Sequence, residues 1–111
     1  MRKTMEVSKS DWKLYREKIG EWQEDYMDRL CQEYIYLLKR KDKHPSEKFW
    51  ELEERICKDK KTPGVRLELR KGNLYWDIAK LIHDKVITFD DLEIFSDDLK
   101  EAVKFMSLSN E

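Results

Sequence analysis

Apolar residues recur along most of this chain at steps of three and four, the spacing of one face of an α-helix. The first series consists of Trp12, Tyr15, Ile19, Trp22, Tyr26 and Leu30. Its phase is unbroken at Gly20, yet glycine costs up to about 1 kcal/mol inside a helix. The pattern therefore predicts a short helix that ends near Gly20 and a longer one over 21–41. Ser8, with Asp11 three residues later, is the expected N-terminal cap.

The helix predicted over 21–41 has the widest apolar arc in the chain. Its apolar residues are Trp22, Tyr26, Met27, Leu30, Cys31, Tyr34, Ile35, Leu37 and Leu38. At 100° per residue they cover an arc of roughly 220°, whereas a helix at the edge of a bundle needs only about 100°. We therefore expect this helix to be the central one, covered by neighbours on two sides. Tyr36 falls outside the arc.

The middle of the chain contains one clear helix and one ambiguous segment. Ser46 is the predicted N-cap of a helix over 47–60. Beyond it, Val65, Leu67 and Leu69 alternate with charged residues, which is a strand signal of minimal length. A lone strand would have no partner in this chain. We therefore predict one helix over 63–84, loosened near residues 72–73.

The last third has the signals of two short helices. Thr88 and Asp91 form a capping-box-like pair, and Ile87 and Leu92 occupy the positions of a hydrophobic staple. They predict a short helix over 89–95, and Ser96 is expected to cap a final helix. The sequence therefore predicts an all-α fold: a compact single-domain bundle of five to six helices over 8–107, between disordered tails at 1–7 and 108–111.

Three of these segments together resemble a known group of proteins. They are EWQEDY at 21–26, KTPGV at 61–65 and VITFDDLEIFS at 86–96. They are similar to small uncharacterised proteins of Gram-positive gut bacteria, over about Asp11 to Phe105. The resemblance implies no activity, cofactor or catalytic residue. Some members carry a multidrug-transporter label, but the longest apolar run here, 34–38, is far shorter than the about 20 residues of a membrane-spanning helix.

The composition predicts a folded cytoplasmic protein. Charged residues make up 42% of the chain, against about 25% in an average protein. Aromatic residues still reach 12% and the net charge is only −1, which is not typical of a disordered chain. No apolar stretch follows the basic start, so we expect no signal peptide. Cys31 and Cys57 have no Cys or His at metal-ligand spacing, and we expect both to be small, reduced core residues.

The charge is unevenly distributed along the chain. Residues 39–71 have a net charge of +5 and residues 72–111 a net charge of −5. The candidate phosphate-binding residues of the basic segment are Lys58, Lys60, Lys61, Arg66, Arg70 and Lys71. Against this, lysines at helix C-termini often only satisfy the helix dipole. Domains that bind nucleic acid by charge usually have a pI above about 9, and this chain has a pI near 6.2.

No motif of the sequence indicates catalysis or metal binding. His83 lies near Asp77 and Asp84, but no serine or cysteine nucleophile stands at recognisable spacing. The carboxylates at 90–91 and 97–98 lack the glycine and the spacing of a calcium loop, and helix capping accounts for them. We therefore expect no catalytic residue, no metal and no cofactor, and we expect that the protein is not an enzyme.

The aromatic residues give the remaining functional signal. Trp12, Trp22 and Trp50 lie on apolar stripes and are expected in the core. Trp76, together with Val65 and Leu69, forms a second apolar face on the helix predicted over 63–84. Second apolar faces with aromatic residues are typical of protein interfaces. The sequence therefore predicts a protein–protein interaction module that binds an unidentified protein or a second copy of itself, and no membrane. The alternative is a nucleic-acid-binding accessory protein that uses the basic segment 39–71.

Overall fold

One long helix, α1 (Lys9–Lys39), belongs to both halves of the molecule. The computed structural model describes residues 6–109, which contain four α-helices, two short 3-10 helices and no strand. The other elements are α2 (Pro45–Asp59), η1 (Lys71–Asn73), α3 (Leu74–His83), η2 (Phe89–Leu92) and α4 (Asp97–Ser109). The all-α class is confirmed, and the described residues form four α-helices rather than five or six.

The prediction of two helices separated at Gly20 is wrong, because α1 continues through this residue. Ile19 and Trp22 are both buried and hold the helix against the rest of the molecule on either side of the glycine, which is itself exposed. Ser8 is the N-cap, as predicted, and its hydroxyl accepts a hydrogen bond from the Asp11 N–H at 3.1 Å. With 31 residues, α1 is about 46 Å long.

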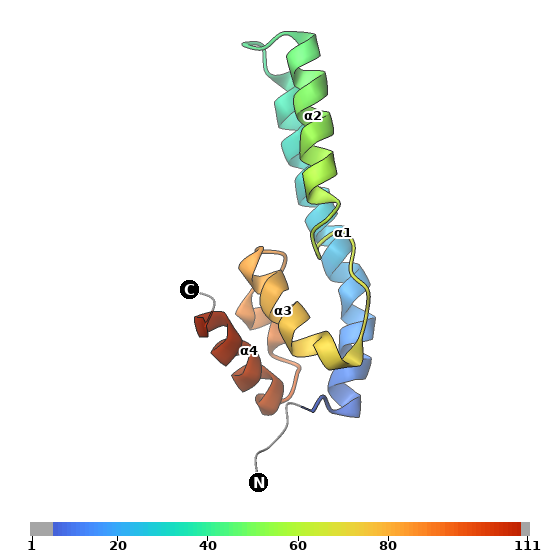
Figure 1. Ribbon diagram of the computed structural model, residues 1–111, viewed down its shortest axis with the longest axis vertical. Coiled ribbons are helices and arrows are strands. Elements are labelled where there is room, and N and C mark those ends of the chain that lie inside the picture. The colour runs from blue at the N-terminus through green and yellow to red at the C-terminus, as the bar shows by residue number, and fades with distance from the viewer. Residues whose placement is uncertain (1–5, 110–111) are drawn as a thin grey trace.

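The lower half of α1 packs with α3 and α4 into a globular body (Figure 1). Among the described residues, the largest fully buried side chains are Tyr15, Leu74, Ile78, Leu81, Leu92, Leu99, Val103 and Asp11. The predicted N-terminal tail extends too far, since Val7 is buried in this core and the carbonyl of Glu6 accepts a hydrogen bond from the Tyr75 hydroxyl. Residues 1–5 and 110–111 lie outside the described part, and the helix α4 continues to Ser109, beyond the predicted end at 107.

Asp11 connects the first turn of α1 to the start of α4. Its buried carboxylate accepts hydrogen bonds from the Ser96 N–H at 3.0 Å and from the Ser96 hydroxyl at 2.5 Å. The same hydroxyl oxygen accepts from the Leu99 N–H at 3.1 Å, so Ser96 caps α4 as predicted. Charge-assisted hydrogen bonds of this kind are roughly twice as strong as neutral ones. They fix where α4 begins relative to α1.

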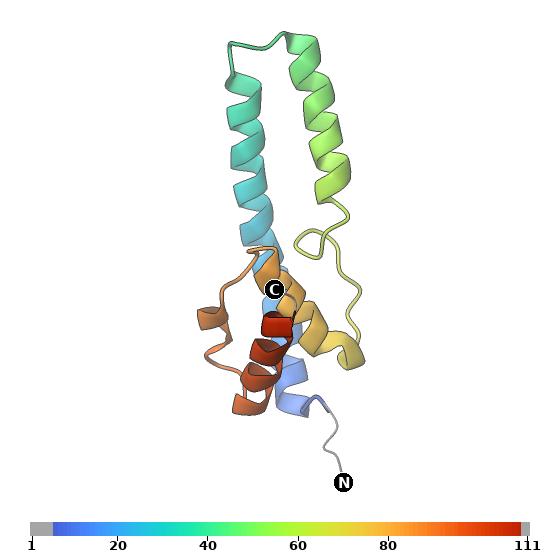
Figure 2. The same cartoon turned by 60° about the vertical axis from the view of Figure 1, so that its left-hand side comes forward.

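The upper half of α1 and the antiparallel α2 form a helical hairpin that projects from the body (Figure 2). The molecule measures 62 × 28 × 23 Å and has a radius of gyration of 17.1 Å, against about 13 Å for a compact domain of this length. The prediction of a central helix over 21–41 is therefore wrong for its upper half, which has a helical neighbour, α2, on one side only.

The starts of two predicted helices differ from those in the structure because of proline and glycine. Helix α2 begins at Pro45, and its N-cap is His44 rather than Ser46, because proline suits the first position of a helix. The His44 N–H donates to the Glu47 carboxylate at 2.8 Å. The helix predicted over 63–84 begins only at residue 71: Gly64 packs closely against the ring of Tyr26, and the chain then runs extended over 66–70.

The alternation of apolar residues in this extended segment reflects one-sided burial rather than sheet pairing. Leu67 packs partly against the core, while its neighbours Arg66 and Glu68 are exposed. The short helix predicted over 89–95 is also shorter in the structure, where only residues 89–92 form a 3-10 turn. No helix among the described residues combines the length and the apolar character that crossing a membrane requires.

The two glycines Gly20 and Gly64 give opposite predictions for alanine substitution. A Cβ at Gly20 would have nothing within 4 Å, so we expect Gly20→Ala to stabilise the protein by about 0.5–1 kcal/mol through helix propensity. A Cβ at Gly64 would lie 2.4 Å from the Tyr26 ring and 2.8 Å from Val86, so we expect Gly64→Ala to destabilise it by about 1–3 kcal/mol. Urea unfolding of both variants measures these changes. A destabilised Gly20→Ala would contradict the continuous α1.

Candidate functional site

The hairpin has one flank made of exposed apolar side chains. On α1, Cys31, Ile35 and Leu38 follow at steps of four and three, and on α2, Phe49 and Ile56 are seven residues apart, so each set shares one side of its helix. All five side chains are exposed; Phe49 is 62% exposed. We call these five residues the apolar flank. Next to it, Trp50 is 63% exposed and packs edge-on against Phe49, with the ring centroids 5.0 Å apart.

The opposite flank of the hairpin is polar and largely satisfied by ion pairs. It is formed by Glu33, Tyr36 and Arg40 on α1 and by Glu51, Arg55 and Lys58 on α2, which line two open hollows. Arg55 pairs with Glu33 at 2.7 Å, and Lys43 of the connecting loop pairs with Glu51 at 2.5 Å. The hydrogen bond from Lys43 lowers the pKa of the Glu51 carboxyl. We call this side the charged flank.

The seam between the two helices is thin. Helix α2 has no fully buried residue, whereas α1 contributes Leu30 and Leu37. The Tyr34 hydroxyl donates to the Asp59 carboxylate at 2.5 Å, and burial together with this hydrogen bond raises the pKa of Tyr34. Arg55 also approaches Asp59, at 3.6 Å. Isolated helices of about 12–15 residues are marginal in water, so α2 rests on a small set of contacts.

A pocket of about 200 Å³ lies at the foot of the apolar flank, where α2 meets the segment that leaves it. Its lining includes Met27, Cys31 and Tyr34 from α1, Ile56 from α2, and Val65. Because Cys31 and Ile56 belong to the apolar flank as well, pocket and flank form one continuous apolar surface.

The three predicted protein-binding residues do not lie on one surface. Val65 lines the foot pocket, whereas Trp76 borders a separate hollow on α3 and is 55% exposed. Leu69 is exposed on the extended segment between them. They would share a face only if 63–84 were one helix, and the extended backbone separates them.

Three expectations for core residues are wrong. Trp50 is exposed, whereas Trp12 and Trp22 pack in or against the core as predicted. Cys31 is exposed and Cys57 is half-buried; both are free thiols. Their stripes face the flanks of the hairpin, where the described residues supply no neighbour to cover them.

The candidate phosphate-binding residues do not share one surface. Lys58 lies on the charged flank and Lys60 at the foot pocket. Lys61, Arg66, Arg70 and Lys71 follow along the segment that descends to α3, and all of them are exposed. Arg70 pairs with Glu68 at 3.1 Å, and the other five form no ion pair within the described residues.

His83 stands beside an open hollow of about 520 Å³ on α3, lined by Trp76, Asp77, Lys80 and His83. Its ring nitrogen Nδ1 lies 3.2 Å from Asp84, and Lys80 reaches the same carboxylate at 3.3 Å. The imidazole is largely exposed, and this hollow contains no serine or cysteine. Across residues 6–109, no group of three or more His, Cys, Asp or Glu side chains is placed to hold a metal ion.

Comparison with protein-family models, with curated proteins and with solved structures found no significant match to this chain. The resemblance to the uncharacterised bacterial proteins therefore stays a prediction.

Asp77 predicts a pH dependence of stability. One of its carboxylate oxygens is buried without a hydrogen-bond partner among the described residues, and burial raises the pKa of Asp77. A raised folded-state pKa means that the unfolded chain binds fewer protons, so Asp77 costs stability as the pH rises from the unfolded value near 4 through the folded pKa. We expect Asp77→Asn to raise the melting temperature at pH 7 and to change little at pH 3. Thermal unfolding at both pH values measures this, and an unchanged melting temperature at pH 7 would contradict it.

Proposed function

We propose that this protein is a non-enzymatic protein-interaction module that binds its partner through the apolar flank of the hairpin. The observation that supports this is the exposure of five apolar side chains in one continuous surface with the foot pocket. Without Trp50, which also borders a hollow on the charged flank, these five side chains expose on the order of 400 Å² of apolar area. Contiguous patches of several hundred Å² on a monomer are often interaction sites.

The contrast between the two flanks supports the same proposal. On the charged flank, Glu33 and Glu51 have basic partners within the chain. The apolar flank has no comparable cover from the described residues. Phe49 and Trp50 also supply the aromatic anchors in which binding energy tends to concentrate at interfaces.

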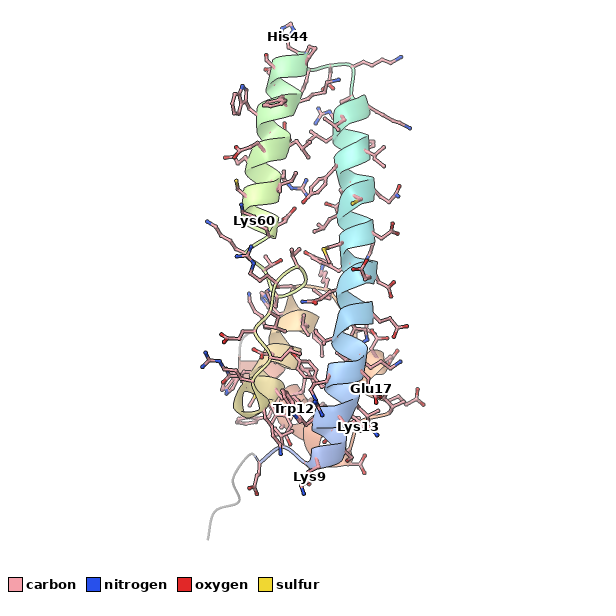
Figure 3. All side chains as sticks on the ribbon, turned by 90° about the vertical axis from the view of Figure 1, so that its right-hand side faces the viewer. Lys9, Trp12, Lys13, Glu17, His44 and Lys60 are labelled. Carbon is pink, nitrogen blue, oxygen red and sulfur yellow. The ribbon has the colours of Figure 1, made fainter. Side chains whose placement is uncertain are left out.

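The alternative, nucleic-acid binding through the basic residues, has weaker support. One of these residues, Lys60, lies on the side of the molecule shown in Figure 3, which also presents the exposed carboxylate of Glu17 on α1. A phosphate backbone on this side would be attracted by the lysines and arginines but repelled by the carboxylates.

Photo-crosslinking tests the proposed surface with a matched control. A photoactivatable phenylalanine derivative is placed at Phe49, on the apolar flank, or at Tyr36, which is 74% exposed on the charged flank. Because both native residues are aromatic and exposed, neither replacement should disturb folding. In cells that express the protein at native levels, we expect protein adducts from position 49 in at least severalfold excess over position 36. Equal yields, or no adduct at position 49, would contradict the proposal.

A further inference from the structure

One stripe of side chains follows the same side of α1 for most of its length. Its members are Glu17, Glu21, Glu24, Asp28, Cys31, Ile35 and Leu38. They alternate at steps of four and three, the spacing that keeps a seam on one side of a helix in coiled coils. All seven side chains are exposed. The lower four are carboxylates, and the upper three are the α1 part of the apolar flank.

Basic side chains follow the other edge of the same face. After Lys60 the chain descends beside the lower half of α1 (Figures 1 and 3). Lys60, Lys61, Arg66, Arg70 and Lys71 are exposed along this descent, and we call them the basic edge. In Figure 3, Lys60 lies at the end of α2 on the left, and Glu17 lies on α1 on the right. The face therefore has an apolar upper part and, below it, an acidic edge beside a basic edge.

This arrangement is complementary to itself under one two-fold rotation. An isologous contact places the same face of both copies together. If the axis runs along the hairpin, α1 of one copy faces α2 and the basic edge of the other. The apolar upper stripe of α1 then meets Phe49 and Ile56, and its acidic lower stripe meets the basic edge. An axis across the hairpin would instead place the carboxylates over the apolar stripe of the partner's α1.

The geometry points to a second copy of this chain as the occupant of the apolar flank: two hairpins pack face to face, with their tips at the same end, into a four-helix bundle. Each helix then has antiparallel neighbours, as in up-and-down bundles. This inference rests on the proposed function and names its partner. To cover this face, a different protein would need an apolar surface, a basic edge and an acidic edge at matching positions. A second copy of this chain has all three features.

The size of the face agrees with a stable dimer. From Glu17 to Leu38 it follows about 33 Å of helix and about 20 Å across two helices, on the order of 650 Å² in projection. Standard interfaces bury about 800 Å² per partner. The apolar part alone is smaller, so the two charged edges are needed to complete the contact.

Charge reversal tests this arrangement by sedimentation equilibrium of the full chain. The variant Glu17→Lys/Glu24→Lys brings the net charge of the acidic stripe from −4 to 0, and the variant Lys61→Glu/Arg66→Glu brings that of the basic edge from +5 to +1. None of these four side chains has an ion partner within the described residues, so folding should be retained, which circular dichroism checks. The matched control for the first variant, Glu93→Lys/Glu101→Lys, makes the same charge change at exposed positions outside the face.

We expect the wild-type chain and the control to dimerise between about 1 and 100 µM. Each edge variant alone should dimerise at least tenfold more weakly. An equimolar mixture of the two should regain part of the association as a heterodimer, because the unchanged basic edge of one variant then faces the unchanged acidic stripe of the other. A wild-type chain that stays monomeric at about 100 µM would overturn the inference. So would edge variants that dimerise like the control, or a mixture without heterodimer.

The two proposals fail separately. A monomeric chain whose position 49 still crosslinks to another protein would overturn the dimer and keep the interaction module. A chain that neither dimerises nor crosslinks at position 49 would overturn both.

Discussion

The continuity of α1 through Gly20 is the constraint on which the rest of the structure depends. One rigid helix packs on α3 and α4 in its lower half and on α2 in its upper half, so the hairpin is held away from the body instead of folding onto it. A break at Gly20 would let α2 return to the body and cover its apolar stripe there. The phase of the apolar series across the glycine, with Ile19 and Trp22 buried on both sides of it, keeps the helix in one piece.

A projecting hairpin leaves apolar surface that one chain does not cover. Helix α2 contributes no fully buried side chain and rests on α1 by partial contacts and by the Tyr34–Asp59 hydrogen bond. On the charged flank, Glu33 and Glu51 have basic partners within the chain, whereas we propose that a second copy covers the apolar flank, the acidic stripe of α1 and the basic edge.

Local signals in the sequence predicted the fold class and several helix ends. Ser8 and Ser96 cap helices as expected because capping depends on a few neighbouring residues. The predicted helix over 63–84 does not form over residues 63–70, because Pro63 and Gly64 lie in a turn. The close packing of Gly64 on Tyr26, which holds this turn, is a tertiary contact that the sequence alone does not reveal. The wide apolar arc of 21–41 predicts burial on two sides, but the upper half of α1 has a helical neighbour on one side only. Nothing in the periodicity distinguishes a neighbour within the chain from a neighbour outside it, so the pattern does not identify Ile35, Leu38, Phe49 and Ile56 as exposed. Val65, Leu69 and Trp76 share a face only on a continuous helix, which does not form.

Hydrogen exchange of the α2 amides, compared at two protein concentrations, tests the central claim most directly. Amide protection reports how often a segment opens, and in a single copy α2 has few contacts to prevent opening. If two hairpins pair through the apolar flank, protection over residues 45–59 increases with protein concentration, while protection of α3 in the body stays the same. Protection of α2 that is independent of concentration, or as high as that of α3 in dilute solution, would contradict the account.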